Sequence, residues 1–361
     1  MSLRLIPVPL LDTLDHPAAW MYDALHLIAK AAALDVYGSA DGVSTAGEWR
    51  IDARDEPATE HHLVLAVDGD DRPESALGFA RCEFPLQSNP RLAYLDMRVL
   101  PEARRQGIGT RLADWAETTA ARAGRTSWVT WTRFDEPIPG TPVVRAAEGD
   151  AMPADSPGLL FALARGYTLR QIERRSRLDL PVSEDLLSQL YAAATPAEAP
   201  YRFHQWSGVP PTEWLDQLSI LTTAMTTDQP MGGLTMAEDP WDPGRLRAAI
   251  ARNWAKGHAD VTTVAEHIPT GELVALTDII APRTPNPYAE QDDTIVRRDH
   301  RGHGLGMAIK ILNLRRVAGQ HPWVERIYTW NASENTHMLA INTALGFRPA
   351  GGSALLQQGD A

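Results

Sequence analysis

The sequence predicts an α/β fold with mixed (α+β-type) sheets, arranged as two tandem domains. Three observations support this: the chain is long, strand-like and helix-like segments alternate along it, and one motif occurs twice. A chain of 361 residues generally divides its hydrophobic core between domains. The composition, 44% hydrophobic and 22% charged, is that of a folded globular protein.

An internal repeat gives the domain boundaries. Gly107 and Gly109 match Gly304 and Gly306 at an offset of 197 residues. Two halves that share one order of features indicate a duplicated domain. We therefore predict an N-terminal domain, a linker and a C-terminal domain at 1–180, 181–200 and 201–361. Further matches at or near this offset are Arg104 with Arg301, Val99 with Val296, Asp96 with Asp293, and Thr130 with Thr329.

The second half alternates strand and helix signals. Proline near the start of 210–225 favours a helix start there. The β-branched residues of 260–282, interrupted by Pro-Thr-Gly, indicate two strands joined by a turn. The full predicted series is a strand at 201–208, helices at 210–225 and 242–257, two strands within 260–282, a strand at 292–298, a helix ending near 314, a strand at 325–332, a helix at 334–346 and a final strand.

The first half has the same order of elements with one insertion. About 19 extra residues lie within 135–157, before its last helix, and their proline, glycine and acidic content predicts a loop. Each domain is then a central mixed sheet flanked by helices. The linker at 181–200 is predicted to be helical or partly ordered between its proline-marked ends.

Charge and hydropathy exclude several classes of protein. The net charge of −12 argues against a nucleic-acid binder, which needs a basic face. The N-terminus resembles no signal peptide, and no run of ~20 apolar residues predicts a membrane span. Cys82 is the only cysteine, so an internal disulfide is impossible. We expect a cytoplasmic protein that binds neither nucleic acid nor membrane.

The repeated glycines predict phosphate-binding loops. A strand, then glycines, then a helix start brings several N–H groups and the positive helix end toward an anion. The dinucleotide pattern G-x-G-x-x-G fails in both halves, because its third position is Leu112 or Ile309, and no Gly-Lys-Ser/Thr loop is present. What occurs twice is Arg-x-x-Gly-x-Gly, at 104–109 and 301–306.

These loops, each preceded by a strand that ends in valine, resemble the pyrophosphate loop of the GNAT acetyltransferase superfamily. A second motif supports the resemblance: "NTHMLAINTALGF" at 335–347 is similar to the last GNAT helix, Asn-x-x-Ala-x-x-x-Tyr-x-x-x-Gly-Phe. The resemblance covers the core of both halves, so the chain resembles a tandem two-domain GNAT protein. It implies acetyl-CoA, or another acyl-CoA, as co-substrate.

The resemblance also implies which residues contact the cofactor. The loop amides would hold the pyrophosphate and the preceding strand the pantetheine arm. His300 and His303 have no third partner at metal spacing, so we expect no metal. Asn331 and Asn335 could contact the cofactor or cap the following helix. The implied contacts are Thr294, Ile295, Val296, Arg301, Gly302, His303, Gly304, Leu305, Gly306, Met307, Asn331 and Asn335 in the second half, and Val99, Arg104, Gln106, Gly107, Ile108 and Gly109 in the first.

Acyl transfer to an amine needs a base for the amine and favours a donor for the leaving thiolate. Many GNAT members carry the base on the strand before the loop, where Glu290 and Asp292 share one face. Their first-half counterparts are Ala93 and Leu95, so we expect the second half to be catalytic and the first to be a relic or structural partner. The usual tyrosine proton donor corresponds to Asn342, which leaves the proton donor open.

The resemblance implies an N-acetyltransferase that moves an acetyl group to a small-molecule amine by direct attack in a ternary complex. By position in the family fold, Asp228, Trp241 and Tyr288 would contact the acceptor. Two alternatives remain: a non-catalytic acyl-CoA-binding regulatory protein, and a protein or peptide N-acetyltransferase. The sequence fixes neither the acceptor, nor the acyl group, nor the oligomeric state.

Overall fold

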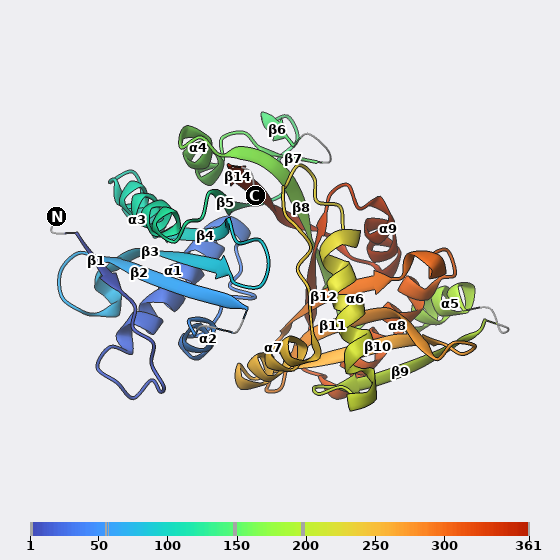
Figure 1. The fold of residues 1–361 in the computed structure, drawn as a ribbon. Helices are drawn as coiled ribbons and strands as arrows, with labels where there is room; N and C mark the ends of the chain where they lie inside the picture. Colours follow the sequence, from blue (N-terminus) through green and yellow to red (C-terminus); the bar gives the residue numbers. More distant parts are fainter. Residues whose placement is uncertain (1–2, 55, 57, 147–149, 196–198, 360–361) are drawn as a thin grey trace. The chain divides into compact units, whose positions relative to one another are not determined.

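The computed structural model describes residues 3–54, 56, 58–146, 150–195 and 199–359 (Figure 1). Its residues form two units that are discontinuous in sequence. Unit 1 comprises Met1–Ile172, Gly232–Ala237 and Gly351–Ala361, and unit 2 comprises Glu173–Met231 and Glu238–Ala350. Each unit has a mixed sheet with helices against it, as the fold class predicts. The domain borders at 180 and 201 stay a prediction.

The sheet of unit 1 has one parallel strand pair, β4–β5. Leu92 pairs with Ser127 and the parallel register ends where Leu95 pairs with Thr130, although both strands continue for four more residues. The strands therefore diverge and leave a gap between them. In sheet order, the strands are β1 (Arg4–Pro7), β2 (Thr59–Val67), β3 (Ala76–Pro85), β4 (Leu92–Val99), β5 (Ser127–Phe134) and the distal part of β14 (Arg348–Gln358).

Helices cover both faces of this sheet because its strands alternate in side-chain direction. Leu63 and Leu65 of β2 pack toward one face with α1 (Trp20–Tyr37) and α2 (Ala46–Asp52). Val64 and Ala66 pack toward the other face with α3 (Ile108–Arg122). The last helix of the unit is α4 (Pro157–Ala164).

The insertion at 135–157 is not simply a loop, which corrects the sequence prediction. It contains a small antiparallel hairpin of β6 (Val143–Arg145) and β7 (Ala151–Pro153), with Met152 fully buried. Residues 147–149 of the insertion lie outside the described residues. The short β-branched and apolar pairs of the hairpin are too brief for the sequence pattern to indicate strands.

Unit 2 repeats this plan with a second divergent parallel pair, β12–β13. Tyr288 pairs with Arg326, and the parallel register ends where Glu290 pairs with Tyr328. In sheet order, the strands are the distal part of β8 (Thr168–Asp179), β13 (Arg326–Ala332), β12 (Tyr288–Val296), β11 (Glu272–Pro282), β10 (His258–His267) and β9 (Tyr201–Ser207). The helices are α5 (Glu184–Ala194), α6 (Leu215–Asp228), α7 (Pro243–Ala255), α8 (Leu305–Gln320) and α9 (Thr336–Leu345), and the short 3₁₀ helices of the chain are Pro73–Ser75, Pro101–Ala103, Thr212–Trp214 and Arg298–His300.

The predicted linker contains the helix α5, and it belongs to unit 2. Side chains of α5 pack against α8 of that unit. Leu187 is buried in a cluster with Ile311 and Leu314 of α8, and Glu184 accepts hydrogen bonds from Arg315. Residues 196–198 of the linker lie outside the described residues. No helix among the described residues is long and apolar enough to cross a membrane.

One strand in the sheet of each unit comes from an unexpected part of the chain. Gly352–Gln358 of β14, at the C-terminus, pair antiparallel with β5 of unit 1. Residues 173–179 of β8 pair antiparallel with β13 of unit 2. The final strand of the repeat in the second half therefore completes the sheet of the first unit.

Shortening Leu356 should destabilise unit 1, because this fully buried β14 side chain packs with Leu159 and Ile172 of the first half. We expect Leu356→Ala to lower the free energy of unfolding by about 2–5 kcal/mol. Leu163→Ala, at a side chain that is 40% exposed, should cost well under half as much. Chemical denaturation of both variants measures the difference, and equal losses would contradict the assignment of β14 to this core.

Candidate active site

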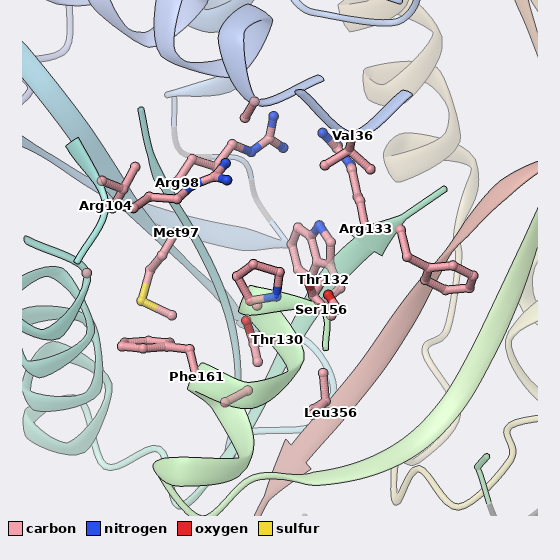
Figure 2. Close-up of a pocket in the computed structure, with 18 of the residues that line it drawn as sticks. Val36, Met97, Arg98, Arg104, Thr130, Thr132, Arg133, Ser156, Phe161 and Leu356 are labelled. Atoms are coloured by element: carbon pink, nitrogen blue, oxygen red, sulfur yellow. The ribbon is translucent and has the colours of Figure 1, made fainter. Parts of the chain in front are cut away.

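Unit 1 contains a cleft of about 740 Å³ between its diverging strands (Figure 2). One wall is the end of β4, from Asp96 to Val99, and the other is the end of β5, from Thr130 to Phe134. Gly107 and Gly109 of the first glycine loop lie at its mouth, and α4 contributes Ser156 through Ala162. Because the strands separate here, backbone groups on their facing edges have no ladder partner and can bind an extended ligand.

The glycine loops of the two halves share one backbone conformation. Arg105 and Gly107 have φ of 63° and 82°, and Gly302 and Gly304 have φ of 79° and 75°. Two left-handed residues before a helix start turn successive N–H groups inward, which makes an anion-binding concavity. Arg105 is a non-glycine residue at positive φ, a conformation that costs free energy and is concentrated at functional sites.

An ion pair repeats in the two loops. Arg104 pairs with Asp35 near the end of α1, with 2.8 Å between Nη1 and Oδ2. Arg301 pairs in the same way with Asp228 at the end of α6, at 2.8 Å, and Asp228 also pairs with Arg298. Asp228, which we expected to contact the acceptor, and Arg301, which we expected to contact the cofactor, are therefore bound to each other.

Arg105 is the charged group of the first loop that stays available. Its side chain is exposed and lines the cleft, and within the described part of the chain its guanidinium has no hydrogen-bond or ion-pair partner. The equivalent position of the second loop is Gly302. The first loop therefore offers a free positive charge to an anion and the second does not.

The second loop is covered by the end of α5. A Cβ atom added at Gly304 would lie 2.2 Å from the carbonyl oxygen of Ala194 and 2.9 Å from its carbonyl carbon. At Gly107 the same added atom meets nothing within 4 Å. The carbonyl end of α5 thus stands against the amino end of α8, where a phosphate would have to bind. Cofactor binding by the second loop, as the sequence analysis expects, requires Ala194 to move.

The other predicted cofactor residues of the second half are mostly engaged within unit 2. Thr294 shares a hydrogen bond of 2.8 Å with Thr277, and the Val296 carbonyl accepts from Arg301. Ile295, Leu305 and Gly306 are buried, Met307 packs in the α8 core, and the ring of His303 lies against the carbonyl of Arg301. Asn335 caps α9 by accepting from the Met338 amide at 3.2 Å, which is the capping role that the sequence left open.

The first-half cofactor residues divide between the cleft and the core. Val99, Arg104, Gly107 and Gly109 line the cleft. Ile108 is 1% exposed and anchors α3 in the core, and Gln106 donates to the carbonyl of Glu102.

Asp96 is a cleft residue that the sequence analysis missed. It directly follows Leu95, the last residue of β4 that pairs with β5, and it is 8% exposed. Arg98 lies on the same face of the strand and donates to its carboxylate at 3.1 and 3.4 Å. The match of Asp96 with Asp293 in the repeat was the available signal. The first half therefore does present a carboxylate at the point where its strands diverge.

The predicted catalytic and acceptor-binding residues of the second half contact neighbouring side chains. Glu290 accepts a hydrogen bond of 2.8 Å from Tyr288. Asn342 is 1% exposed and its Nδ2 donates to Asn331 at 2.8 Å, whereas its buried Oδ1 has no hydrogen-bond partner within the part of the chain that the structure describes. Trp241, expected at the acceptor site, stacks on the Arg245 guanidinium at 4.3 Å.

Asp292 belongs to a row of carboxylates on neighbouring strands. It keeps an exposed surface, yet desolvation by the surrounding atoms and the like charges of Asp293 and Glu290 raise its pKa well above the ordinary range. Desolvation likewise raises the pKa of Asp293 to about 6, and desolvation with the charge of Asp292 raises that of Asp278. The row lies at an irregularity in the β11–β12 register. Such carboxyls can accept protons near neutral pH.

Comparisons with known proteins agree with the fold and motifs. Residues 30–136 match the sequence profile described as "Acetyltransferase (GNAT) family". No curated protein sequence matches the chain.

Three solved structures show the likeness over the whole chain. A tandem GNAT protein from the clavulanic acid biosynthesis pathway is 26% identical, with a TM-score of 0.74, and the match covers 99% of this chain and 98% of that one. A GCN5-related N-acetyltransferase from Sphaerobacter thermophilus is 14% identical, with a TM-score of 0.61 and coverage of 99% and 95%. A GCN5-related glucosamine N-acetyltransferase region of a fungal multi-domain β-N-acetylglucosaminidase is 13% identical, with a TM-score of 0.61 and coverage of 99% and 38%.

The two glycine loops should respond differently to a methyl group. Gly107→Ala and Gly304→Ala both place alanine at positive φ, which costs about 1–2 kcal/mol. Gly304→Ala must also displace the Ala194 carbonyl, so its loss of stability should be distinctly larger. Denaturation midpoints of the two variants measure this. Equal losses would mean that α5 does not cover the second loop in solution.

Asp293→Asn should stabilise the protein increasingly as pH rises. The folded-state pKa of Asp293, about 6, exceeds its unfolded value, so the folded state holds the proton longer and loses stability as pH rises from roughly 4 to 6. The free energy of unfolding of Asp293→Asn relative to wild type should grow over this window and then level off.

Asp299→Asn is the matched control. Despite slight desolvation, the hydrogen bond and charge of Arg297 hold the pKa of Asp299 below its ordinary value, so this variant's difference from wild type should stay flat between pH 4 and 6. A flat difference for Asp293→Asn as well would contradict the raised pKa.

Proposed function

We propose that this chain, whose residues 30–136 match the GNAT acetyltransferase family and whose fold is similar to that of a tandem GNAT protein, transfers an acetyl group from acetyl-CoA to a small-molecule amine, with the cofactor bound in the cleft of unit 1. The observation that carries the proposal is the contrast between its two glycine loops. The loop at Gly107 opens on a cleft with a free arginine, whereas the loop at Gly304 meets the carbonyl of Ala194.

The cofactor would use the cleft along its whole length. The loop amides and Arg105 hold the pyrophosphate, and the pantetheine arm extends along the free edge of β4 beside Val99. The acyl end then reaches Asp96 and Thr130, because the cleft closes where β4 and β5 pair.

Direct attack by the amine suits the side chains present. The amine nitrogen attacks the acetyl carbon, the carbon–sulfur bond breaks with its electron pair on sulfur, and the amine proton passes to the carboxylate of Asp96 or to water. Cys82 is a poor nucleophile, because burial and then the charge of Glu83 raise the pKa of its thiol to about 12. A ternary complex without an acyl-enzyme therefore fits better than a covalent route.

The competing assignment places catalysis in the second half, on Glu290 and Asp292 with Asn342 in the tyrosine position. The raised pKa of Asp292 favours it. The engaged Asn342 and the covered loop weigh against it. The contrast between the loops makes unit 1 the stronger assignment.

A small-molecule acceptor is favoured only by the similarity of the chain to a tandem GNAT protein of known structure. The tandem GNAT protein that matches nearly the full chain comes from a pathway that makes a small molecule. A non-catalytic acyl-CoA-binding protein, and an enzyme that acetylates peptides, are the alternatives. Steady-state rates of acetyl transfer to a panel of amines distinguish an enzyme from a non-catalytic binding protein. Rates with peptide acceptors test whether the enzyme acetylates peptides.

Calorimetric titration with acetyl-CoA should find about one site per chain. Arg105→Glu reverses an exposed charge that has no partner to lose, so we expect it to fold normally and to weaken binding at least about tenfold. Arg122→Glu, in the last turn of α3, the helix that follows this loop, lies outside the cleft; it is the control and should bind like wild type.

Unchanged affinity in Arg105→Glu would place the cofactor elsewhere, and two sites per chain would mean that α5 yields to the ligand. No binding at all would overturn the acetyltransferase proposal. Tight binding without turnover on any amine would favour the regulatory alternative.

A further inference from the structure

Ser156 occupies the N-cap position of α4, but its side chain makes no capping hydrogen bond. It occupies the position before Pro157, the first residue of α4, where a serine hydroxyl usually accepts from an amide two or three residues on. Ser156 makes no such bond, and among the described residues its hydroxyl has no other partner. The residue is nevertheless only 9% exposed, and its unpaired hydroxyl belongs to the lining of the cleft.

The unused hydroxyl lines the unit 1 cleft, where Figure 2 draws it with Thr130 and Thr132. The first turn of α4 presses tightly on β5, since a Cβ atom at Gly158 would lie 2.0 Å from Oγ1 of Thr132. Thr132 is two residues beyond Thr130, the last residue of β5 that pairs with β4. The first turn of α4, with Ser156 before it, therefore lies beside β5 just beyond the point where β5 stops pairing with β4.

The start of α4 is suited to a negative charge. Pro157 has no N–H group, and the amides of Gly158 and Leu159 have no partner within the helix. With the helix dipole, these amides and the Ser156 hydroxyl form a set of donors without an internal acceptor. Thr130 differs, because its hydroxyl donates to the carbonyl of Leu95 at 2.8 Å.

We infer that Ser156 and the first turn of α4 bind the sulfur of CoA and stabilise the thiolate as it leaves; this inference rests on the proposed function. The anion that acyl transfer generates at the closed end of the cleft is that thiolate. The tyrosine of the last GNAT helix offers no alternative donor, because aligning Gly166 on Gly346 places Ala162 opposite Asn342.

The step balances without a second acid. The carbon–sulfur bond breaks with both electrons on sulfur, and the amine proton goes to Asp96 or to water. Ser156 keeps its own proton and donates a hydrogen bond to the thiolate. Donors placed where charge develops lower a barrier in proportion to that charge, so Ser156 should act on turnover more than on binding.

The test is the ionisation of bound CoA, which needs no acceptor. The protein is saturated with CoA, the thiolate absorbance is followed through a pH titration, and the complex with desulfo-CoA serves as the blank. A free thiol ionises near pH 8.5. We expect the bound thiol of wild type to ionise below this value, and the Ser156→Ala complex to ionise about one pH unit higher than wild type.

Two further variants and a rate measurement sharpen the outcome. Ser156→Thr keeps a hydroxyl and should keep most of the effect. Ser183→Ala is the control, because Ser183 precedes α5 with nearly the same backbone angles and no capping bond but is exposed and outside the cleft. With an accepted amine, Ser156→Ala should lower kcat about 10- to 100-fold while KM for acetyl-CoA changes less than about twofold.

The result separates this inference from the proposed function. CoA binding with the same thiol ionisation in wild type and Ser156→Ala overturns the inference and leaves the cofactor site standing. A parallel shift in Ser183→Ala overturns it too, since the effect would then be general. Failure of wild type to bind CoA overturns the proposed function and the inference together.

Discussion

The separation of two parallel strands is the constraint on which the candidate site depends. A parallel pair satisfies its backbone groups only while its strands stay adjacent, and β4 and β5 stay adjacent for four residues from Leu92 to Leu95. Beyond this point the strands need other partners, and a ligand with amide groups can supply them on the inner edges. The glycine loop before α3 and the first turn of α4 at Ser156 both line the cleft that this separation leaves. The positions proposed for the phosphate, the acyl group and the thiol all follow from where the strands separate.

The same loop conformation has different surroundings in the two halves. Left-handed residues at matching positions and an ion pair to the preceding helix recur in both, so the loop geometry survives the duplication. What differs is the neighbour: an open cleft at Gly107 and a helix end at Gly304. The carbonyl end of α5 carries partial negative charge and the amino end of α8 partial positive charge, so their contact is favourable in itself. The chain thereby satisfies internally an anion site that the first loop leaves for a ligand.

The sequence was informative wherever a local pattern or a repeat carried the information. The glycine loops and most helices and strands of the second half lie at the predicted positions, and Asn335 takes one of the two roles that the sequence left open. The partner of a strand is not encoded in its periodicity, so the pairing of β14 with β5 could not be predicted. The contact between Ala194 and Gly304 joins segments more than one hundred residues apart and leaves no local signal.

The two site residues that the sequence did not indicate, Asp96 and Ser156, escape prediction for different physical reasons. Asp96 corresponds to neither Glu290 nor Asp292 at the offset of the repeat, and β12 has a register irregularity at this point that β4 lacks. Such an irregularity changes which face a residue presents, so alternation cannot be transferred from one half to the other. Ser156 sits in a segment that is otherwise apolar, and only its burial and missing capping bond distinguish it.

The exchanged strand explains why a half with a covered loop is still needed. Leu356 of β14 lines the cleft of unit 1 and packs in its core, yet it is encoded at the end of the second half. The strand that carries it begins with Arg348 to Ala350 in unit 2 and continues in unit 1 from Gly351. Removing the second half would therefore leave β5 with an unpaired edge and the cleft with a missing wall. The second half of the chain thus supplies a strand to unit 1 that is independent of what its own glycine loop binds.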